Sequence, residues 1–443
     1  MIARNSAEEL QAVLDAACAD GRIDAGCLAI AGQSGEHACV AGRANVPEDI
    51  AATTDTVLHI GSITKLITAE LIWRMIVDGA LTLEMPVIEA APELAHIETL
   101  RDSAITIGQL LSHTGGLDGD VIFEVGRGPD VLRKFMAEID EIGSLFTPGD
   151  RFSYANVAYN ILGRILEVRG GKVYQDALGR HLREDCGLAH IAILPEDKIR
   201  MRTAVHFSTI DGELVPSTFG PNSNIASGAV LAMSMPDLAR WGVGLLDNAE
   251  LVEGLTTPVI ALPHNYRFEG WGYGAILLDG MGSRLFGHDG GTEGTSSFLR
   301  IAPEQKTAWA FAATGDAVLA VYRELEPLLR EACAVGSAPD RRPAGEAPTD
   351  LSIYEGCYRR HGMRFRITVG EESTLLLRAD GDATPPVLDG LVLEPLDRSI
   401  FETRVGELGA PTWLSFHEFD DSGVPQLFFV IERMARRTGE AAS

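Results

Sequence analysis

The sequence predicts an α/β protein in which helices flank an antiparallel sheet, an all-helical region interrupts the strands, and a small C-terminal β-barrel-like domain follows. Three observations lead to this prediction. Apolar residues repeat with helical spacing near both ends of the first 335 residues, and strand-like runs lie just inside those helices. A stretch rich in Pro, Gly and charge at 336–350 then precedes a series of short alternating runs. Helix and strand spacings distinguish these elements, and their order along the chain indicates the layers.

The N-terminal elements end at a conspicuous serine. Residues 6–20 have the pattern of an amphipathic helix, and strand-like runs follow at 26–33, 37–43 and 55–59. From Ser62 the pattern becomes helical and apolar until the Asp78-Gly79 pair, which is a typical helix end. A serine therefore stands at a predicted strand–turn–helix junction.

The middle of the chain, from about 86 to 260, is predicted to be mainly helical, with Gly and Pro between helices. Strands are then expected at 271–278, 283–287, 296–301 and 307–314, and a helix at 316–335. This order places the predicted helical block between strands of one antiparallel sheet, so residues 1–335 are expected to form one domain.

The C-terminal part, residues 351–437 after the linker at 336–350, is expected to form a small all-β domain. Short strands separated by turn residues are predicted at 365–369, 374–378, 391–394, 400–404, 413–418 and 426–431. Even spacing of short strands fits a barrel or a sandwich, and both remain open at this point.

Composition excludes several classes of function. The formal net charge of −26 argues against nucleic acids and anionic membranes as partners, and the acidity is expected to serve solubility. The six cysteines form no C-x-x-C pair, so neither zinc nor redox chemistry is expected, and no cofactor is implied. The N-terminus has no signal-peptide pattern and no stretch is long enough to cross a membrane, so a cytoplasmic protein is expected.

The first candidate motif is Ser62-Ile63-Thr64-Lys65. Residues i and i+3 share one face of a helix, so the Lys65 amine is expected beside the Ser62 hydroxyl. A serine needs such a base to become a nucleophile, and a helix N-terminus favours a developing negative charge. The alternative is an N-capping serine with an unrelated lysine nearby.

The second candidate motif is Tyr154-Ala155-Asn156, in a turn that leads into an apolar helix. A phenol beside a lysine can exchange protons with Ser62 and with the leaving group, and Asn156 can hydrogen-bond Lys65 and a substrate amide. The alternative is a half-buried tyrosine followed by a helix cap.

The third candidate motif is the glycine-rich run 287–294, which contains His288, Gly290 and Gly291. Glycines allow a substrate to approach the backbone closely, and one N–H group here can complete an oxyanion hole with the N–H group of Ser62. His288 can orient the substrate. The alternative is an ordinary hairpin.

Together the three motifs resemble those of the serine β-lactamase and penicillin-recognising enzyme superfamily. The branch that the chain resembles contains class C β-lactamases, family VIII carboxylesterases, D-aminopeptidases and DD-peptidases, with the motifs S-x-x-K, Y-x-N and K-T-G or H-x-G in this order. The resemblance extends over about 7–335 and includes the flanking segments Ile60–Lys65, Ile105–Leu117 and Gly287–Thr292. It implies a β-lactamase/transpeptidase-like fold. The run Tyr354–Tyr358 is similar to the start of lipocalin-like domains of some D-aminopeptidase relatives, where a domain of this kind can cover the active-site mouth or serve packing alone.

The resemblance also implies roles for the motif residues. Ser62 is the acylated nucleophile, Lys65 and Tyr154 share the proton transfers, and Asn156 binds the substrate amide. The N–H groups of Ser62 and Gly291 form the oxyanion hole. His113, in the flanking segment, is expected to be structural, because a buried and hydrogen-bonded histidine is the commoner case.

One departure from the family pattern affects the expected substrate. His288 stands where β-lactamases have a lysine that attracts a carboxylate, and Asp289 is expected to add negative charge beside it. Esters, amides or D-aminoacyl compounds are therefore expected, in hydrolysis or in transfer to an amine acceptor. The alternatives are a β-lactamase or DD-peptidase, and a non-catalytic binding protein that keeps the fold.

Overall fold

The structure is a computed structural model, and it describes residues 4–33, 35–210, 213–217, 220–262, 264–265, 267–279, 284–343, 345–381, 388–403 and 412–440. Within this part of the chain, no helix combines the length and the apolar character that a membrane crossing requires.

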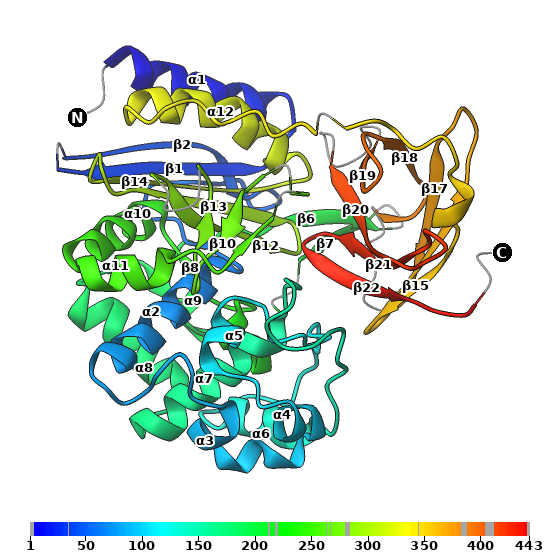
Figure 1. Cartoon of the computed structure of the whole chain (residues 1–443). Coiled ribbons are helices and arrows are strands. Elements are labelled where there is room, and N and C mark those ends of the chain that lie inside the picture. Colours follow the sequence, from blue (N-terminus) through cyan, green and yellow to red (C-terminus); the bar gives the residue numbers. More distant parts are fainter. Residues whose placement is uncertain are drawn as a thin grey trace.

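An antiparallel sheet organises the larger part of the molecule (Figure 1). Its strand order is β3-β2-β1-β14-β13-β12-β11-β10-β9, so strands from the two ends of the first 335 residues meet at its centre. The long strands β1 and β14 pair from Ala25↔Thr314 to Gly32↔Thr307. The strands are β1 (Ala25–Gly32), β2 (Gly35–Asn45), β3 (Ile50–Ala51), β9 (Ile260–Ala261), β10 (Gly270–Trp271), β11 (Ile276–Leu277), β12 (Phe286–Thr292), β13 (Thr295–Ala302) and β14 (Thr307–Thr314).

Helices cover both faces of this sheet. On one face lie α1 (Arg4–Ala19) and α12 (Val318–Ala332), which pack against each other; on the other face α10 (Met235–Gly244) packs on β1 and β14 (Figure 1). The predicted α/β fold is therefore confirmed. The strand predicted at 271–278 is instead two short strands, β10 and β11, because Gly272 and Gly274 stand at a turn between them. Of the strand predicted at 283–287, Ser283 lies outside the described residues.

The helical block surrounds α2 (Ile63–Val77), which is apolar on nearly every side and buried in the core. Further helices are α3 (Val87–Ala90), α4 (Glu98–Asp102), α5 (Ile107–Leu111), α6 (Val131–Glu138), α7 (Asn156–Gly170), α8 (Tyr174–Arg180), α9 (Pro195–Lys198) and α11 (Ala249–Thr256). Short helices are η1 (Pro92–His96), η2 (His181–Asp185), η3 (Asn222–Ser227), η4 (Leu245–Asp247) and η5 (Ser352–Tyr354). Small sheets are formed by β4 (Leu58–His59), β5 (Ile191–Ala192) and β8 (Ala232–Met233), and by β6 (Phe207–Ile210) and β7 (Glu213–Pro216).

The C-terminal segment is a closed barrel, not a sandwich. Its strands are β15 (Gly356–Arg360), β16 (Met363–Val369), β17 (Leu375–Asp380), β18 (Leu391–Pro395), β19 (Ile400–Thr403), β20 (Trp413–Phe419), β21 (Pro425–Val430) and β22 (Arg433–Arg437). Pairing of β22 with β15, at Tyr358↔Arg437, closes it. These two strands were not predicted, because their arginines obscure the apolar alternation.

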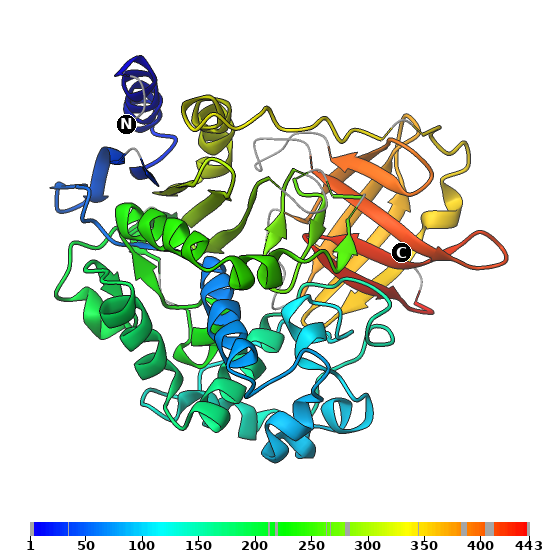
Figure 2. The ribbon, with the colours of Figure 1, turned by 60° about the vertical axis from the view of Figure 1, so that its left-hand side comes forward.

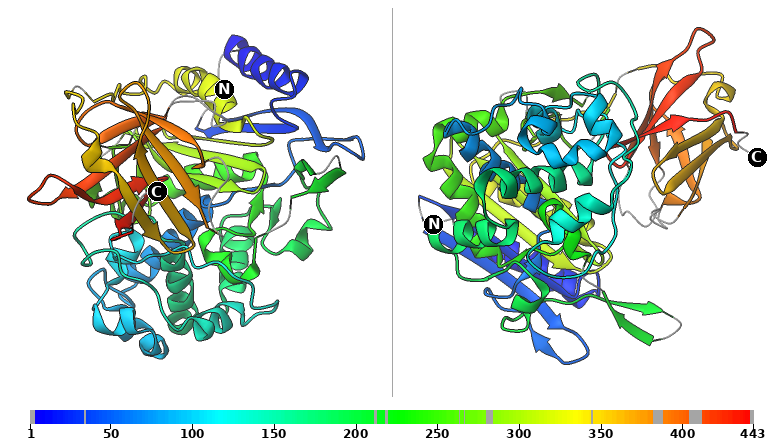
Figure 3. Two further views of the ribbon diagram at one scale, coloured as in Figure 1. Left: turned by 90° about the vertical axis from the view of Figure 1, so that its right-hand side faces the viewer. Right: turned by 90° about the horizontal axis from the view of Figure 1, so that it is seen from below.

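The barrel lies against one side of the larger part (Figures 1, 2 and 3). The hairpin of β21 and β22 reaches the segment just before α7: the Tyr154 N–H group donates to the Glu432 carbonyl oxygen at 2.9 Å. The Met434 N–H group donates to the Ser153 hydroxyl at 3.2 Å. One backbone hydrogen bond therefore joins the barrel to Tyr154 of the second candidate motif, and a bond to the Ser153 side chain lies next to it.

Candidate active site

Glycines allow the start of α2 and strand β12 to lie in contact. Gly61 has a φ of +50°, and a Cβ atom there would lie 2.7 Å from the backbone nitrogen of Gly291. A Cβ atom on Gly290 would lie 2.0 Å from the Ile60 carbonyl oxygen. Real Cβ atoms do not approach other atoms this closely, so both positions require glycine. The approach places Ser62, at the N-terminus of α2, beside the glycine-rich strand.

The Lys65 amine lies next to the Ser62 hydroxyl, as the spacing predicts. The distance from Nζ to the Ser62 Oγ is 3.0 Å, and Nζ also donates to the Ser227 carbonyl oxygen. Lys65 is fully buried. Burial lowers its pKa well below the usual value, and the Arg433 guanidinium acts in the same direction, while Asp120 opposes it. The environment thus favours the neutral amine, the form that can accept a proton from Ser62.

Tyr154 is the third member of this group. Lys65 Nζ and the guanidinium carbon of Arg433 each lie 4.8 Å from the centroid of its ring. Burial raises the pKa of the phenol, and the neighbouring Ser62 hydroxyl and Arg433 oppose that rise. Among the described residues, no group makes a hydrogen bond of ordinary geometry with the phenol oxygen, although the Ser62 hydroxyl lies close enough to lower the pKa of the phenol as a hydrogen-bond partner. The phenol is therefore available to a substrate.

His113 packs against the ring of Tyr154. The two rings are stacked with centroids 4.3 Å apart, and His113 Nδ1 accepts a hydrogen bond from the Ala155 N–H group at 3.1 Å. Burial lowers the pKa of His113 well below the usual value, so the ring is neutral. These contacts agree with the structural role expected for His113.

His288 lies on β12, buried and close to the aromatic group. Its ring centroid is 5.4 Å from that of Trp271 and 6.4 Å from that of Tyr154. Nδ1 bonds the Asp289 carbonyl oxygen, which assigns the proton to Nδ1 and leaves Nε2 as an acceptor. Burial lowers the pKa of His288 to about 3, so this ring is neutral as well.

The expectation that Asp289 adds negative charge to the site is wrong. Its carboxylate is paired with the guanidinium groups of Arg300 and Arg267. Burial opposes ionisation, yet these two cations hold the pKa of Asp289 below its usual value. Two positive charges therefore surround one negative charge, and the cluster as a whole does not repel a substrate carboxylate. Arg300 is separated from Asp289 by eleven positions and Arg267 by twenty-two, so local spacing does not indicate either pair.

Asn156 has a different partner from the one expected. Its Nδ2 donates to Asp120 Oδ1 at 2.8 Å, and no described contact joins it to Lys65. Asp120 also accepts from Arg433 Nε at 2.6 Å and from Arg360 Nη2 at 2.7 Å. Burial disfavours the Asp120 carboxylate, but the two arginines hold its pKa below the usual value. Asn156 consequently lines a separate cavity of about 220 Å³ at the junction with the barrel.

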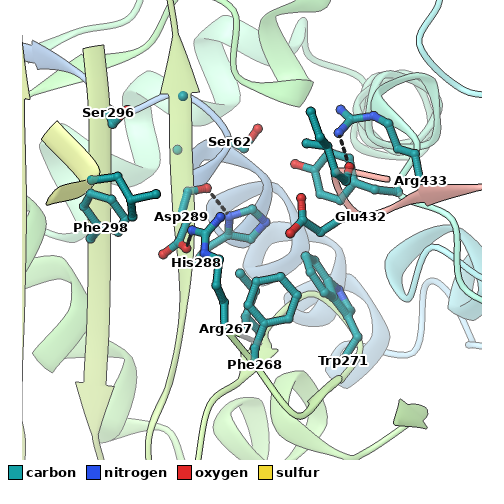
Figure 4. Close-up of a pocket in the computed structure, with 16 residues that line it drawn as sticks. Ser62, Arg267, Phe268, Trp271, His288, Asp289, Ser296, Phe298, Glu432 and Arg433 are labelled. Atoms are coloured by element: carbon teal, nitrogen blue, oxygen red, sulfur yellow. Dashed lines mark hydrogen bonds and ion pairs between the residues drawn. The ribbon is translucent and has the colours of Figure 1, made fainter. Parts of the chain in front are cut away.

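Most of the predicted residues line one cavity beside Ser62, which we call the main cavity. It has a volume of about 460 Å³, and Ser62, Tyr154, His288, Gly290 and Gly291 line it (Figure 4). Lys65 lies beneath Ser62 and is fully buried.

Several lining residues were not predicted. The barrel contributes Ile431, Glu432 and Arg433, and the larger part adds Arg267 and Trp271 (Figure 4). In the sequence the barrel residues had no signal beyond an apolar run that ends in an arginine-rich strand. Among the described residues, no group of three or more His, Cys, Asp or Glu side chains is arranged to hold a metal ion.

Known proteins have sequences similar to that of this chain. Penicillin-binding protein 4 of Amycolatopsis lactamdurans is 30% identical over 367 residues, which cover 79% of this chain and 96% of the relative. Esterase EstB of Burkholderia gladioli is 26% identical over 325 residues, covering 62% of this chain and 81% of the relative.

Solved structures extend the similarity to the barrel. The crystal structure of SurE has a TM-score of 0.78 and 25% identity, and the match covers 98% of this chain and 99% of SurE. The structure of D-amino acid amidase from Ochrobactrum anthropi SV3, complexed with L-phenylalanine amide, has a TM-score of 0.61 and 20% identity. The match covers 74% of this chain and 98% of the amidase chain, and at this identity it shows only that the two proteins share a fold. A model of the beta-lactamase family matches residues 10–334. The chain belongs to the beta-lactamase family, whose members are serine hydrolases.

Proposed function

We propose that this protein forms an acyl-Ser62 intermediate from an ester or amide and passes the acyl group to water or to an amine. One observation carries the proposal: a fully buried lysine amine lies 3.0 Å from the hydroxyl of a serine that opens onto the cavity. A neutral amine at hydrogen-bond distance is the general base that a serine nucleophile requires.

In the proposed acylation, Lys65 takes the Ser62 proton as Oγ attacks the carbonyl carbon of the substrate. The N–H groups of Ser62 and Gly291 stabilise the oxyanion. Support comes from the start of α2, where the helix dipole favours negative charge, and from Gly291, at which a Cβ atom would meet nothing within 4 Å. Tyr154, with no ordinary hydrogen-bond partner among the described residues, gives its phenol proton to the leaving group, and the proton that Lys65 took from Ser62 restores the phenol.

Asn156 has a less direct part in this proposal than the family motif implies. Its amide nitrogen is committed to Asp120, which leaves its oxygen as the group that can meet a substrate N–H. His288, neutral and with Nε2 as an acceptor, can orient the acyl donor from the opposite wall.

Aminoacyl compounds fit the proposed substrate class. SurE has been solved with D-Leu, and the Ochrobactrum amidase is a D-amino acid amidase solved with an amino acid amide. A cavity of about 460 Å³ lies within the range of small-molecule sites and has room for an acyl group and an acceptor. We therefore include aminoacyl esters and amides as donors, and amines as acceptors, in biosynthetic metabolism.

A β-lactamase or DD-peptidase activity is the second candidate. The pairing of Asp289 with Arg267 and Arg300 removes the electrostatic objection to a carboxylate-bearing β-lactam, and a penicillin-binding protein is 30% identical to this chain. Turnover of a chromogenic cephalosporin, compared with that of p-nitrophenyl esters and D-amino-acid amides, separates the two candidates. Each assay is run with and without an added amine.

The acyl-enzyme proposal is tested directly by labelling with a fluorophosphonate, followed by intact-mass measurement. One adduct on the wild type, absent in Ser62→Ala, is expected. A wild type that gains no adduct would show a binding protein that keeps the fold. An adduct that persists in Ser62→Ala would place the nucleophile elsewhere.

A further inference from the structure

The tip of the β21–β22 hairpin is held inside the mouth of the main cavity. Val430 pairs with Arg433, and the two residues between them, Ile431 and Glu432, have φ values of +46° and +58°. Such a turn is usual for Gly or Asn and unfavourable for a β-branched residue like isoleucine. The hydrogen bond from the Tyr154 N–H group to the Glu432 carbonyl oxygen fixes this tip beside the candidate nucleophile.

The turn conformation aims the Glu432 side chain into the cavity. In Figure 4 its carboxylate extends from the barrel side toward His288 and lies between Ser62 and Trp271 in the view. The structure thus places a carboxylate from the barrel in the same cavity as the Ser62 hydroxyl.

Glu432 differs from the other charged residues that line this cavity. Arg267 and Asp289 pair with each other, and Arg433 pairs with Asp120. Within the described part of the chain no cation pairs with the Glu432 carboxylate, and its one side-chain partner is the neutral amide of Asn265 at 3.4 Å. The neighbouring Arg433 acts on the Glu432 carboxylate through its charge, but its guanidinium is paired with Asp120, so the carboxylate has no ion pair of its own to replace lost hydration. A cationic group of a bound ligand could therefore form the ion pair that the Glu432 carboxylate lacks.

The rest of the cavity wall accepts such a cation. His288 is neutral, so it does not repel positive charge. Trp271 and Tyr154 present aromatic surfaces, which attract ammonium groups. The arginines of the wall pair with Asp289 and Asp120, each of which is shared by two arginines, so Glu432 is the lining carboxylate that has no ion pair among the described residues.

We propose that Glu432 binds the ammonium group of an aminoacyl donor and so selects donors with an unblocked amino group. This inference rests on the proposed acyl transfer at Ser62 and names a substrate class for it. It also gives the barrel a direct part in specificity, because the selecting carboxylate lies on the barrel hairpin and the nucleophile lies on α2.

The test compares donors that differ only in the charge on nitrogen. D-Leucine p-nitroanilide and N-acetyl-D-leucine p-nitroanilide are assayed with the wild type, with Glu432→Gln and with the control Glu371→Gln, an exposed glutamate elsewhere on the barrel. The measured quantity is the ratio of kcat/KM for the unblocked donor to that for the acetylated donor. This ratio is expected to fall about 10- to 100-fold in Glu432→Gln, as for loss of a charged hydrogen bond, mainly through KM, and to stay at the wild-type value in Glu371→Gln.

A second measurement does not depend on turnover. D-Leucine amide should protect Ser62 from the fluorophosphonate, and the concentration for half protection should rise about 10- to 100-fold in Glu432→Gln; N-acetyl-D-leucine amide should protect both proteins equally. Protection and kcat/KM ratios that are the same in Glu432→Gln and in the wild type would overturn the inference. Absence of any Ser62 adduct in the wild type would instead overturn the proposed function.

Discussion

Replacing Lys65 with methionine is the most informative single change, because it separates the proposed catalytic role of this lysine from its effect on stability. Methionine keeps the unbranched shape but cannot take a proton. A positioned general base contributes about 10²–10⁴-fold, so acylation of Ser62 should slow by that factor, equivalent to about 2.7–5.4 kcal/mol of activation free energy. The fluorophosphonate labelling rate measures this step, and Lys172→Met, at an exposed lysine after α7, is the matched control.

The effect on stability follows from the burial of Lys65. Its two hydrogen-bond acceptors, the Ser62 hydroxyl and the Ser227 carbonyl, lose their donor in the variant, and a buried acceptor left unpaired costs about 1–3 kcal/mol. Against this, the wild type must bury an amine whose pKa is lowered by burial. The two terms oppose each other, so the variant is expected to fold.

The sign of the pH dependence distinguishes this account from a simple packing role. Since the pKa of Lys65 is lower in the folded protein, the unfolded chain binds more protons between that value and the unperturbed value of 10.5. The free energy of unfolding of the wild type, relative to Lys65→Met, should therefore rise with pH in that window by up to about 1.4 kcal/mol per unit. Urea unfolding from pH 7 to 10 measures the difference. A difference that is flat or falls with pH, or labelling at the wild-type rate, would refute the reasoning.

Three further changes test other parts of the site. Tyr154→Phe should lower kcat more than it raises KM in ester turnover, with little change in urea stability, because no described group makes an ordinary hydrogen bond to the phenol oxygen; an effect on KM alone would contradict the proton role. Asp120→Asn should lower the free energy of unfolding by about 3–5 kcal/mol, since it leaves buried arginines without their carboxylate, whereas Asp140→Asn, at an exposed position, should change it little. Gly61→Ala should abolish labelling of Ser62, because its Cβ atom would lie 2.7 Å from a backbone nitrogen; Gly79→Ala, with positive φ but nothing within 4 Å, controls for backbone strain.

Local spacing made the centre of the site predictable. Ser62 and Lys65 are three residues apart on one helix, so their contact follows from helix geometry once the helix start is known. The order of the motifs revealed the family resemblance, and the resemblance predicted that Tyr154 and His288 lie in one cavity with Ser62. Local spacing alone cannot predict such a long-range arrangement. The sheet was predicted for a similar reason: its long strands have clear alternation or continuous apolar runs.

Electrostatic partners could not be predicted in this way. The charge of Asp289 was misjudged because its effect depends on Arg267 and Arg300, which reach it only through strand pairing and a loop. The partner of Asn156 was missed because Asp120 is fixed by arginines of the barrel, more than two hundred positions away. A single carboxylate in a sequence does not reveal whether a cation neutralises it.

The barrel therefore belongs to the electrostatics of the site and is more than a cover for it. Arg433 lies 4.8 Å from the centroid of the Tyr154 ring, lowers the pKa of Lys65 and holds Asp120 against Asn156. Positive charge at this point favours the neutral form of Lys65, which the proposed mechanism needs, and opposes the rise in the pKa of Tyr154. The S-x-x-K and Y-x-N residues come from the larger part of the chain, but the charge of Arg433 that acts on Lys65 and Tyr154 comes from β22. The barrel and the residues around Ser62 therefore form one electrostatic unit.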